Sequence, residues 1–233
     1  GVFSMSAHFP ELVDFERDSQ TRLNGPIAAP LGRLYRHGLK CMLDVSLVLG
    51  SAIFWLPVIL IAALLVARDG HNPFYIQKRI GQNGRVFRMI KLRSMVPDAD
   101  AVMAEYLASN PAARAEWDRD QKLKNDPRIT RLGRIIRKSS LDELPQLFNV
   151  LLGDMSLVGP RPMMVGQKGL YSGDSYYALR PGLTGFWQIS DRNECRFADR
   201  VGFDNAYDRA VSLRTDIGVL VRTVSVVVRG TGY

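Results

Sequence analysis

The stretch "VSLVLGSAIFWLPVILIAALLVA", residues 45–67, decides what kind of fold this chain can adopt. It contains no charged side chain over about 23 residues, and a helix needs roughly 20 apolar residues to cross the hydrocarbon core of a bilayer. We therefore expect this segment to contact a membrane.

Two paths through the membrane are open to this segment, because Pro57 lies near its middle and bends or breaks a helix there. Lys and Arg residues normally gather on one side of a single span. Here they flank both ends: Arg33, Arg36 and Lys40 before the segment, and Arg68, Lys78, Arg79, Arg85 and Arg88 after it. This pattern favours a re-entrant helical hairpin broken at Pro57, and the alternative is an ordinary span with a proline kink. We expect the basic residues before the segment to lie on lipid phosphates, and the alternative is that they are simple stop-transfer charges.

The overall composition indicates a folded chain with anionic partners. Its 233 residues are 46% hydrophobic, enough for one large domain or two small ones with a real core. The net charge of +8 suits nucleic acid, phosphorylated small molecules or an acidic membrane face. Cys41 and Cys195 lie far apart and outside any Cys/His cluster, so we predict neither a zinc site nor a disulfide framework. Residues 1–30 lack the apolar core of a secretory signal peptide, and we expect a flexible lead-in.

A β-hairpin is predicted after the hydrophobic segment. Asn83-Gly84 lies between two β-rich runs, and both residues accept the positive φ angles of tight turns. Alternate residues of a strand share one face, so Lys91 and Arg93 should project together.

Two helices without assigned chemistry are predicted over residues 98–124. The first should begin at Pro97 or Asp98 and the second at Pro111, because proline is favoured in the first turn of a helix.

A row of arginines follows at helical spacing: Arg128, Arg131, Arg134 and Arg137. This spacing predicts a ridge of guanidinium groups along one helix face. Neighbouring like charges repel by a few tenths of a kcal/mol, roughly, so the ridge calls for an anion. Lipid phosphate, substrate phosphate or the carboxylates just downstream could each supply it.

Those carboxylates are Asp142 and Glu143, and two interpretations of them remain open. An apolar helix stripe, made by Leu141, Leu144, Leu147, Phe148 and Leu151, leaves both acids outside it. In the structural interpretation Asp142 is the N-cap, Pro145 falls at the third helical position, and Glu143 complements the helix dipole, together worth about 1 kcal/mol. In the functional interpretation the same helix start binds phosphate, because the arginine ridge ends there.

Two further arginines are candidates for anion binding. Arg161 lies between Pro160 and Pro162, which restrict the backbone and reduce the entropy lost on binding. Arg180 precedes a Pro-Gly turn, with Phe186 and Trp187 nearby as a candidate platform for a base or sugar; the sequence has both features in "LRPGLTGFWQIS".

Three motifs, in this order after a basic, proline-broken hydrophobic segment, resemble the bacterial sugar transferase family of monotopic polyprenyl-phosphate phosphoglycosyltransferases. They are "KLRSM" (91–95), "DPRITRLGRIIRKSSLDELPQLFNVLLGDMSLVGPRP" (126–162) and "LRPGLTGFWQIS" (179–190). The similarity runs from about Arg33 to the C-terminus and is weakest over residues 98–124. Within the family the chain looks most like enzymes that start exopolysaccharide repeat units with galactose 1-phosphate or glucose 1-phosphate.

The resemblance implies a catalytic Asp142-Glu143 dyad and a requirement for Mg²⁺, which both carboxylates would bind. Asp142 would attack the β-phosphate of a UDP-sugar, release UMP and pass the sugar 1-phosphate to undecaprenyl phosphate, a covalent mechanism with ping-pong kinetics. Glu143 would act as metal ligand or base.

The substrate-binding residues follow from the same resemblance and from their charge. Arg137 is the first choice for phosphate. Lys91, Arg93, Arg161 and Arg180 are further candidates for the uridine diphosphate and the acceptor phosphate. The family commonly has glycine after its Trp-Gln pair where this chain has Ser190-Asp191-Arg192, so no substrate role is assigned to Arg192.

We therefore expect a helix-rich α/β fold with a small β-hairpin or sheet, in a monotopic membrane protein. Its parts would be a flexible segment 1–30, a re-entrant helix 31–70 and a catalytic domain 71–233, which faces the cytoplasm at the bacterial inner membrane. Its partners would be a UDP-sugar, polyprenyl phosphate and inner-membrane lipids; a homo-oligomer is left open. Nucleic acid is disfavoured, because the basic residues accompany a membrane segment rather than exposed aromatics.

Two rival functions are separable by product. A non-catalytic membrane-anchored module that binds anionic lipid or nucleic acid would release no UMP. A membrane-bound phosphohydrolase would leave sugar 1-phosphate in water.

Overall fold

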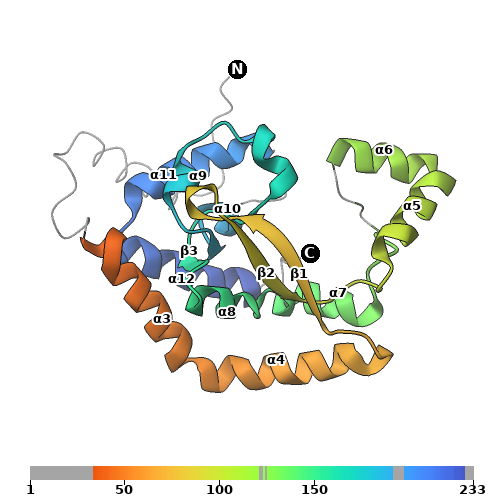
Figure 1. Ribbon diagram of the computed structural model, residues 1–233, viewed down its shortest axis with the longest axis horizontal. Coiled ribbons are helices and arrows are strands. Elements are labelled where there is room, and N and C mark those ends of the chain that lie inside the picture. Colours follow the sequence, from red (N-terminus) through yellow and green to blue (C-terminus); the bar gives the residue numbers. More distant parts are fainter. Residues whose placement is uncertain (1–33, 121–122, 124, 191–196, 229–233) are drawn as a thin grey trace.

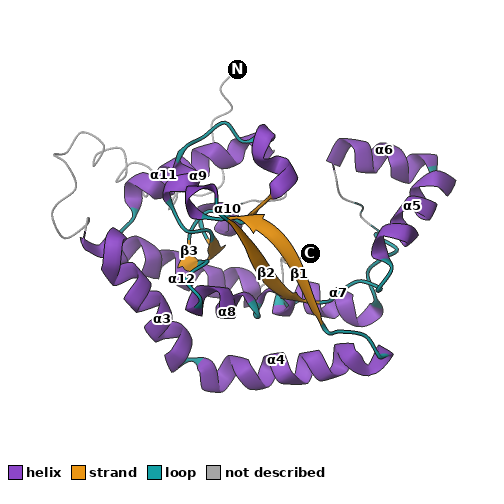
Figure 2. Cartoon of the chain, in the orientation of Figure 1, coloured by secondary structure: helices purple, strands orange, loops and turns teal. Residues whose placement is uncertain are grey.

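A computed structural model of the chain describes residues 34–120, 123, 125–190 and 197–228. Helices surround two small sheets (Figures 1 and 2), which confirms the predicted helix-rich class with a small hairpin. The expected lead-in 1–30, Arg33 and the departure at Asp191-Arg192 lie outside the described residues.

The hydrophobic segment forms two helices, α3 (Lys40–Gly50) and α4 (Ala52–Val66), which meet at an angle along the lower edge of Figure 1. The break lies at Ser51, so the predicted break at Pro57 is wrong: Pro57 lies inside α4. Ser51 Oγ donates to the Leu47 carbonyl at 2.7 Å, in competition with the helical backbone. The Trp55 indole donates to the Val48 carbonyl at 3.0 Å, which satisfies an acceptor at the break.

Most apolar side chains of α4 are exposed. Ile53 and Phe54 are each 75% exposed, and Leu64 is 62% exposed. Ala52–Asp69 is long and apolar enough to cross a membrane by length and composition, the one such helix in the described part of the chain. The structure thus presents a largely exposed apolar helix of the length and composition that membrane contact requires.

Buried polar contacts attach the start of this segment to the rest of the protein. Lys40 Nζ lies 2.5 Å from Asp216 Oδ2, and both side chains are at most 7% exposed. Tyr35 and Tyr207 donate their hydroxyls to the same carboxylate at 2.6 and 2.7 Å. Arg36 pairs with Asp208 at 2.6 Å. Arg36 and Lys40 therefore bind carboxylates of the protein, and the expectation that they lie on lipid phosphates is wrong.

The predicted hairpin is confirmed as β1 (Phe74–Ile80) and β2 (Val86–Leu92), with Ile80 opposite Val86. Asn83 and Gly84 both have positive φ, 56° and 75°, as the turn requires. β4 (Met163–Met164) adds a third antiparallel strand beside β1.

The remaining elements are helices and a second, smaller sheet. The helices are α5 (Ala99–Ser109), α6 (Pro111–Asp120), α7 (Arg131–Lys138), α8 (Gln146–Leu151), α9 (Ser175–Ala178), α10 (Phe186–Ile189), α11 (Arg200–Ala210) and α12 (Leu213–Val228). The two predicted helices over 98–124 are α5 and α6, and Pro111 begins the second. A parallel pair, β3 (Ser156–Val158) and β5 (Gly182–Thr184), forms the second sheet.

The expected four-arginine ridge is only partly formed. α7 begins after Thr130, whose hydroxyl caps the helix by accepting from the Gly133 N–H at 2.8 Å. Arg128 lies before the helix and binds Asp126 at 2.6 Å. The ridge therefore consists of the three arginines that lie on α7.

Gly133 places α7 directly against the end of β2. A Cβ at this position would lie 1.9 Å from the Ser94 carbonyl oxygen, far inside van der Waals contact. No residue with a side chain fits there unless the backbone moves.

Loss of Lys40 should destabilise the fold strongly. Lys40→Ala leaves Asp216 buried without its counter-ion, and we expect the free energy of unfolding to fall by about 3–5 kcal/mol. Thermal unfolding in detergent measures it. Arg114→Ala is the control, because it removes an exposed pair with Asp118 and should cost under about 1 kcal/mol. Equal effects of the two variants would contradict the anchoring role.

Candidate active site

Asp142 and Glu143 lie in one 3-10 turn, Leu141–Glu143, between α7 and α8. The turn begins at Ser140, whose φ of 56° is uncommon for a residue other than glycine. α8 starts only at Gln146, after Pro145, so the predicted N-cap role of Asp142 is wrong. The two acids therefore belong to a connecting turn that precedes α8.

The apolar stripe around the dyad packs as predicted. Leu147 is buried in the main core, with Leu144, Phe148 and Leu151 against it. Leu141 packs beside Ile136 in a smaller cluster that also holds the end of α4. Because these leucines face inward, the carboxylates between them face the end of β2.

Lys91 and Arg161 meet the carboxylates. Lys91 Nζ lies 2.9 Å from Glu143 Oε1 and 3.9 Å from Asp142 Oδ2. Arg161 Nη2 lies 3.3 Å from the same Glu143 oxygen. The side chains of Asp142, Lys91 and Glu143 are 14%, 18% and 22% exposed, so the cluster is largely shielded from water but still accessible.

Burial raises the pKa of Asp142 to about 6. Lys91 opposes this rise, the neighbouring Glu143 adds to it, and Arg137 opposes it. Asp142 is thus a partly desolvated carboxylate that nearby cations keep ionised at neutral pH.

Arg137 lies at the edge of the cluster. Its Nε donates to Ser94 Oγ at 2.8 Å, and its charge acts on Asp142. Arg131 and Arg134 are exposed on the same helix, and the described residues provide no side-chain hydrogen bond or ion pair for either. Of the ridge, only Arg137 approaches the dyad.

Arg93 does not reach the carboxylates. It binds Asp69 through Nη1 and Nη2, at 2.8 and 2.7 Å, and its Nε donates to the Asn72 carbonyl at 2.8 Å. The expectation that it projects with Lys91 into one site is therefore wrong; Arg93 ties the end of α4 to β2.

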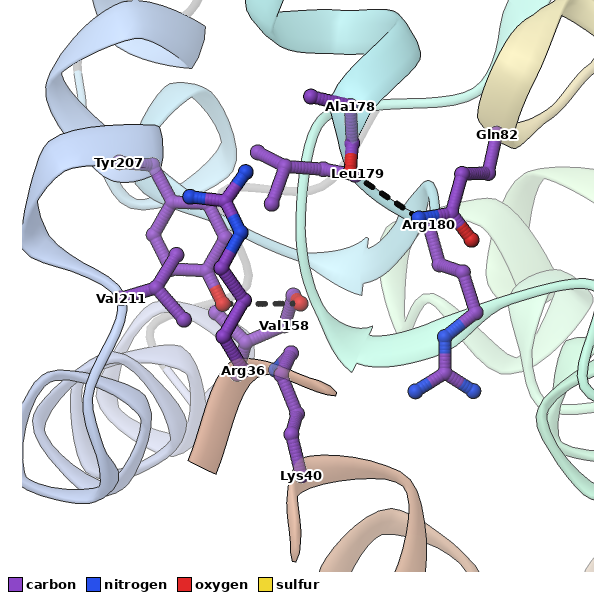
Figure 3. Close-up of a pocket in the computed structure, with 9 residues that line it drawn as sticks. All are labelled: Arg36, Lys40, Gln82, Val158, Ala178, Leu179, Arg180, Tyr207 and Val211. Atoms are coloured by element: carbon purple, nitrogen blue, oxygen red, sulfur yellow. Dashed lines mark hydrogen bonds between the residues drawn. The ribbon is translucent and has the colours of Figure 1, made fainter. Parts of the chain in front are cut away.

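Arg180 lies in a different pocket (Figure 3). Arg36, Lys40 and Arg180 surround it, and Gln82 from the hairpin turn donates to the Ala178 carbonyl at its rim at 3.0 Å. Lys91 pairs with Tyr75 at the opposite end of the hairpin, about 17 Å of strand from Val86 at roughly 3.3 Å per residue. Arg180 is therefore separate from the carboxylate cluster.

Asn149 is a positioning residue that the sequence reasoning missed. It is fully buried in α8, where its amide accepts from the Ile90 N–H at 3.0 Å and donates to the Arg88 carbonyl at 2.8 Å. These two hydrogen bonds join α8 to β2 and so fix the position of Lys91 beside Asp142 and Glu143. One signal was available: Asn149 is a polar residue flanked by Phe148 and Val150 in an apolar helix.

The carboxylates provide a small donor set for a divalent cation. The described part of the chain holds no cluster of three His, Cys, Asp or Glu side chains that could bind a metal alone. Mg²⁺ commonly takes one or two carboxylates together with substrate phosphates, so Asp142 and Glu143 fit that ion as a pair.

Comparison with known proteins identifies the family of this chain. A family model described as bacterial sugar transferase matches residues 35–230. The chain is 48% identical over 196 residues to the UDP-galactose-lipid carrier transferase of Erwinia amylovora, and 47% identical over 196 residues to the undecaprenyl-phosphate galactose phosphotransferase of Salmonella typhimurium. It is 42% identical over 206 residues to the exopolysaccharide production protein ExoY of Rhizobium meliloti.

These matches cover most of this chain but different shares of the relatives. They include 83% of the chain and 41% of the Erwinia and Salmonella proteins, and 87% of the chain and 89% of the Rhizobium protein. The chain thus spans about two fifths of the length of the first two. The family match and these identities show that the chain belongs to the bacterial sugar transferase family.

Proposed function

We propose that this chain transfers a sugar 1-phosphate, galactose or glucose, from a UDP-sugar to undecaprenyl phosphate. The reaction releases UMP, proceeds through a covalent phospho-sugar on Asp142, and is the first membrane step of exopolysaccharide synthesis. The names of the Salmonella and Rhizobium relatives support this reaction class.

One observation carries the proposal: two adjacent carboxylates lie in a shielded turn against Lys91 and Arg161. Four largely desolvated charges are costly to assemble for stability alone. Phosphoryl transfer needs this combination, because a nucleophile must approach a diphosphate whose negative charge is neutralised.

In the first step an Asp142 carboxylate oxygen forms a bond to the β-phosphorus of the UDP-sugar. The bond from that phosphorus to the oxygen it shares with the α-phosphate breaks, and UMP leaves with the electron pair. Lys91 and Arg137 attract the nonbridging phosphate oxygens and keep Asp142 ionised.

In the second step a phosphate oxygen of undecaprenyl phosphate attacks the same phosphorus and the Asp142 carboxylate departs unchanged. Arg161 is placed to release Glu143 and bind the donor diphosphate in the first step, because its contact with that carboxylate is long, at 3.3 Å. Mg²⁺, held by Asp142 and Glu143, would neutralise charge on the diphosphate.

Exposed apolar side chains on α3 and α4 support a site beside a membrane, and the end of α4 packs in the same cluster as Leu141. We propose that both helices enter the cytoplasmic leaflet of the inner membrane and return. The dyad would then face the cytoplasm, within reach of a lipid-borne phosphate.

Asp142→Asn should abolish the covalent intermediate. Protein incubated with UDP-sugar radiolabelled in the sugar should retain label after denaturation, and the variant should retain none, because an amide cannot form the acyl phosphate. Asp118→Asn, in the exposed pair on α6, is the matched control and should label fully.

Other outcomes separate the rivals. Full labelling or turnover by Asp142→Asn would refute the nucleophile. Ligand binding without UMP release would indicate a binding module, and labelled sugar 1-phosphate in water would indicate a phosphohydrolase.

Asp142→Asn should also stabilise the fold near pH 7.5 in metal-free buffer. The folded state holds the Asp142 proton more tightly than the unfolded chain does, so the parent gains stability as pH falls from about 6 toward 4. At neutral pH the ionised carboxylate costs about 1–3 kcal/mol, at roughly 1.4 kcal/mol per pKa unit. Thermal unfolding from pH 4 to 8 should show a variant advantage that disappears near pH 4. A constant difference across this range would contradict the assignment.

The path of the hydrophobic segment can be tested by labelling single cysteines. Leu39→Cys and His71→Cys, at exposed positions before α3 and after α4, are made with Cys41 and Cys195 replaced by serine. An impermeant maleimide should label both from the cytoplasmic side of inverted membrane vesicles. Labelling from opposite faces would establish an ordinary span.

A further inference from the structure

Two arginines from elements that are distant in the sequence donate hydrogen bonds to the loop that carries Arg161. Arg79 of β1 donates from Nη1 to the Pro162 carbonyl at 3.0 Å. Arg200 of α11 donates from Nη2 to the carbonyl of Arg161 itself. The two peptide groups on either side of Pro162 are therefore held by the half-buried Arg79 and the buried Arg200.

The positive charges of Arg79 and Arg200 are poorly compensated by hydrogen bonds and counter-ions. Arg200 is 6% exposed, and the Nε atoms of Arg79 and Arg200 are buried without a hydrogen-bond partner among the described residues. No carboxylate of those residues forms an ion pair with either side chain. Asp204 acts on Arg200 through its charge, but its carboxylate accepts from the Tyr171 hydroxyl at 2.8 Å. A buried and a half-buried cation without a direct counter-ion among the described residues exceed what loop stability requires.

The three guanidinium groups also influence one another. Burial, together with the charges of Arg161 and Arg200, lowers the pKa of Arg79 to about 10. Mutual repulsion favours an arrangement in which one of the three turns outward. Arg161 is the outward one: its side chain is 35% exposed and directed at Glu143.

The geometry depends on the forked shape of the guanidinium group. Arg79 uses Nη1 for the Pro162 carbonyl and Nη2 for Gln77 Oε1, at 2.5 Å. Arg200 is fixed from the other side by ring faces, with Phe197 at 5.0 Å and Trp187 at 6.0 Å from its Cζ. A lysine has the charge but not the planar fork that reaches two acceptors.

We propose that Arg79 and Arg200 are positioning residues that set Arg161 toward the diphosphate of the nucleotide donor. They act by fixing the Arg161 and Pro162 carbonyls, so that the Arg161 guanidinium faces the dyad before substrate arrives. This inference rests on the proposed function, since it assigns the residues that orient one of its phosphate-binding groups.

The test is a double-mutant cycle on the KM for UDP-sugar, measured by UMP release. Arg79→Gln, Arg200→Gln and Arg161→Ala should each raise KM about tenfold or more, the value of a charged hydrogen bond, and change kcat less. When either glutamine substitution is combined with Arg161→Ala, KM should rise by no more than about a further twofold, because the substituted arginine acts through the Arg161 guanidinium, which is then absent. Lys78→Gln, at the neighbouring exposed position of β1, is the control and should leave KM unchanged.

Conservative variants separate positioning from charge. Arg79→Lys should recover little of the lost affinity, and full rescue would show that charge alone suffices and overturn the proposal. Multiplicative losses in the double variants would overturn it as well. The dissociation constant for UMP, measured by titration without catalysis, should change among the variants in the same pattern as KM.

Two control measurements accompany the double-mutant cycle: thermal unfolding of each variant and UMP release by the parent protein. Thermal unfolding identifies any variant that does not fold. Because Arg79 and Arg200 donate to different carbonyls, the KM of whichever variant does fold is enough to test the positioning role. Absence of UMP release by the parent protein would count against the proposed function. An active parent whose double variants show multiplicative losses in KM would count against the positioning role alone.

Discussion

The buried ion pair between Lys40 and Asp216 is the contact on which the arrangement of this protein depends. It joins the start of the hydrophobic segment to α12, and two tyrosine hydroxyls complete the shell of the shared carboxylate. One turn further along α3, Asp44 accepts from Ser156 of β3 at 2.6 Å. With α3 held at two points, the bend at Ser51 directs α4 beneath the sheet, where its far end packs against Leu92 and Ile136. An apolar segment that would otherwise move independently thus becomes one wall of the candidate site.

Charge balance explains why the dyad can be buried. Asp142 and Glu143 lie side by side, which is unfavourable by itself, and Lys91 lies within 4 Å of both. Arg161 and Arg137 add positive charge from two other directions. The result is nearly neutral at rest. Under the proposed function, Lys91 and Arg161 would each exchange a carboxylate partner for a phosphate oxygen.

Much of the fold could be predicted from local patterns in the sequence. Asn83-Gly84 predicted the hairpin, Pro111 the start of α6, and the leucines around the dyad their inward packing. The break in the hydrophobic segment could not be placed, because proline is the stronger general signal. The Ser51 hydroxyl and the Trp55 indole that satisfy the broken helix act only once the chain has folded.

The candidate site could be predicted only in part, because charge shows which residues bind anions but not where they lie. Lys91 and Arg161 do meet the dyad, and Arg137 approaches it. Arg93 and Arg180 do not, since each is held by a partner distant in sequence: Asp69 for Arg93, and Cys41 Sγ for Arg180 at 3.2 Å. Strand alternation alone could not separate Lys91 from Arg93.

The contact at Gly133 limits how this site can vary over evolutionary time. Every single-nucleotide change of a glycine codon that alters the residue introduces a side chain or stops translation, and the Ser94 carbonyl leaves no space for one. The seam between α7 and β2 must therefore be inherited unchanged. Variation in the candidate site has to arise at positions that do not support this seam.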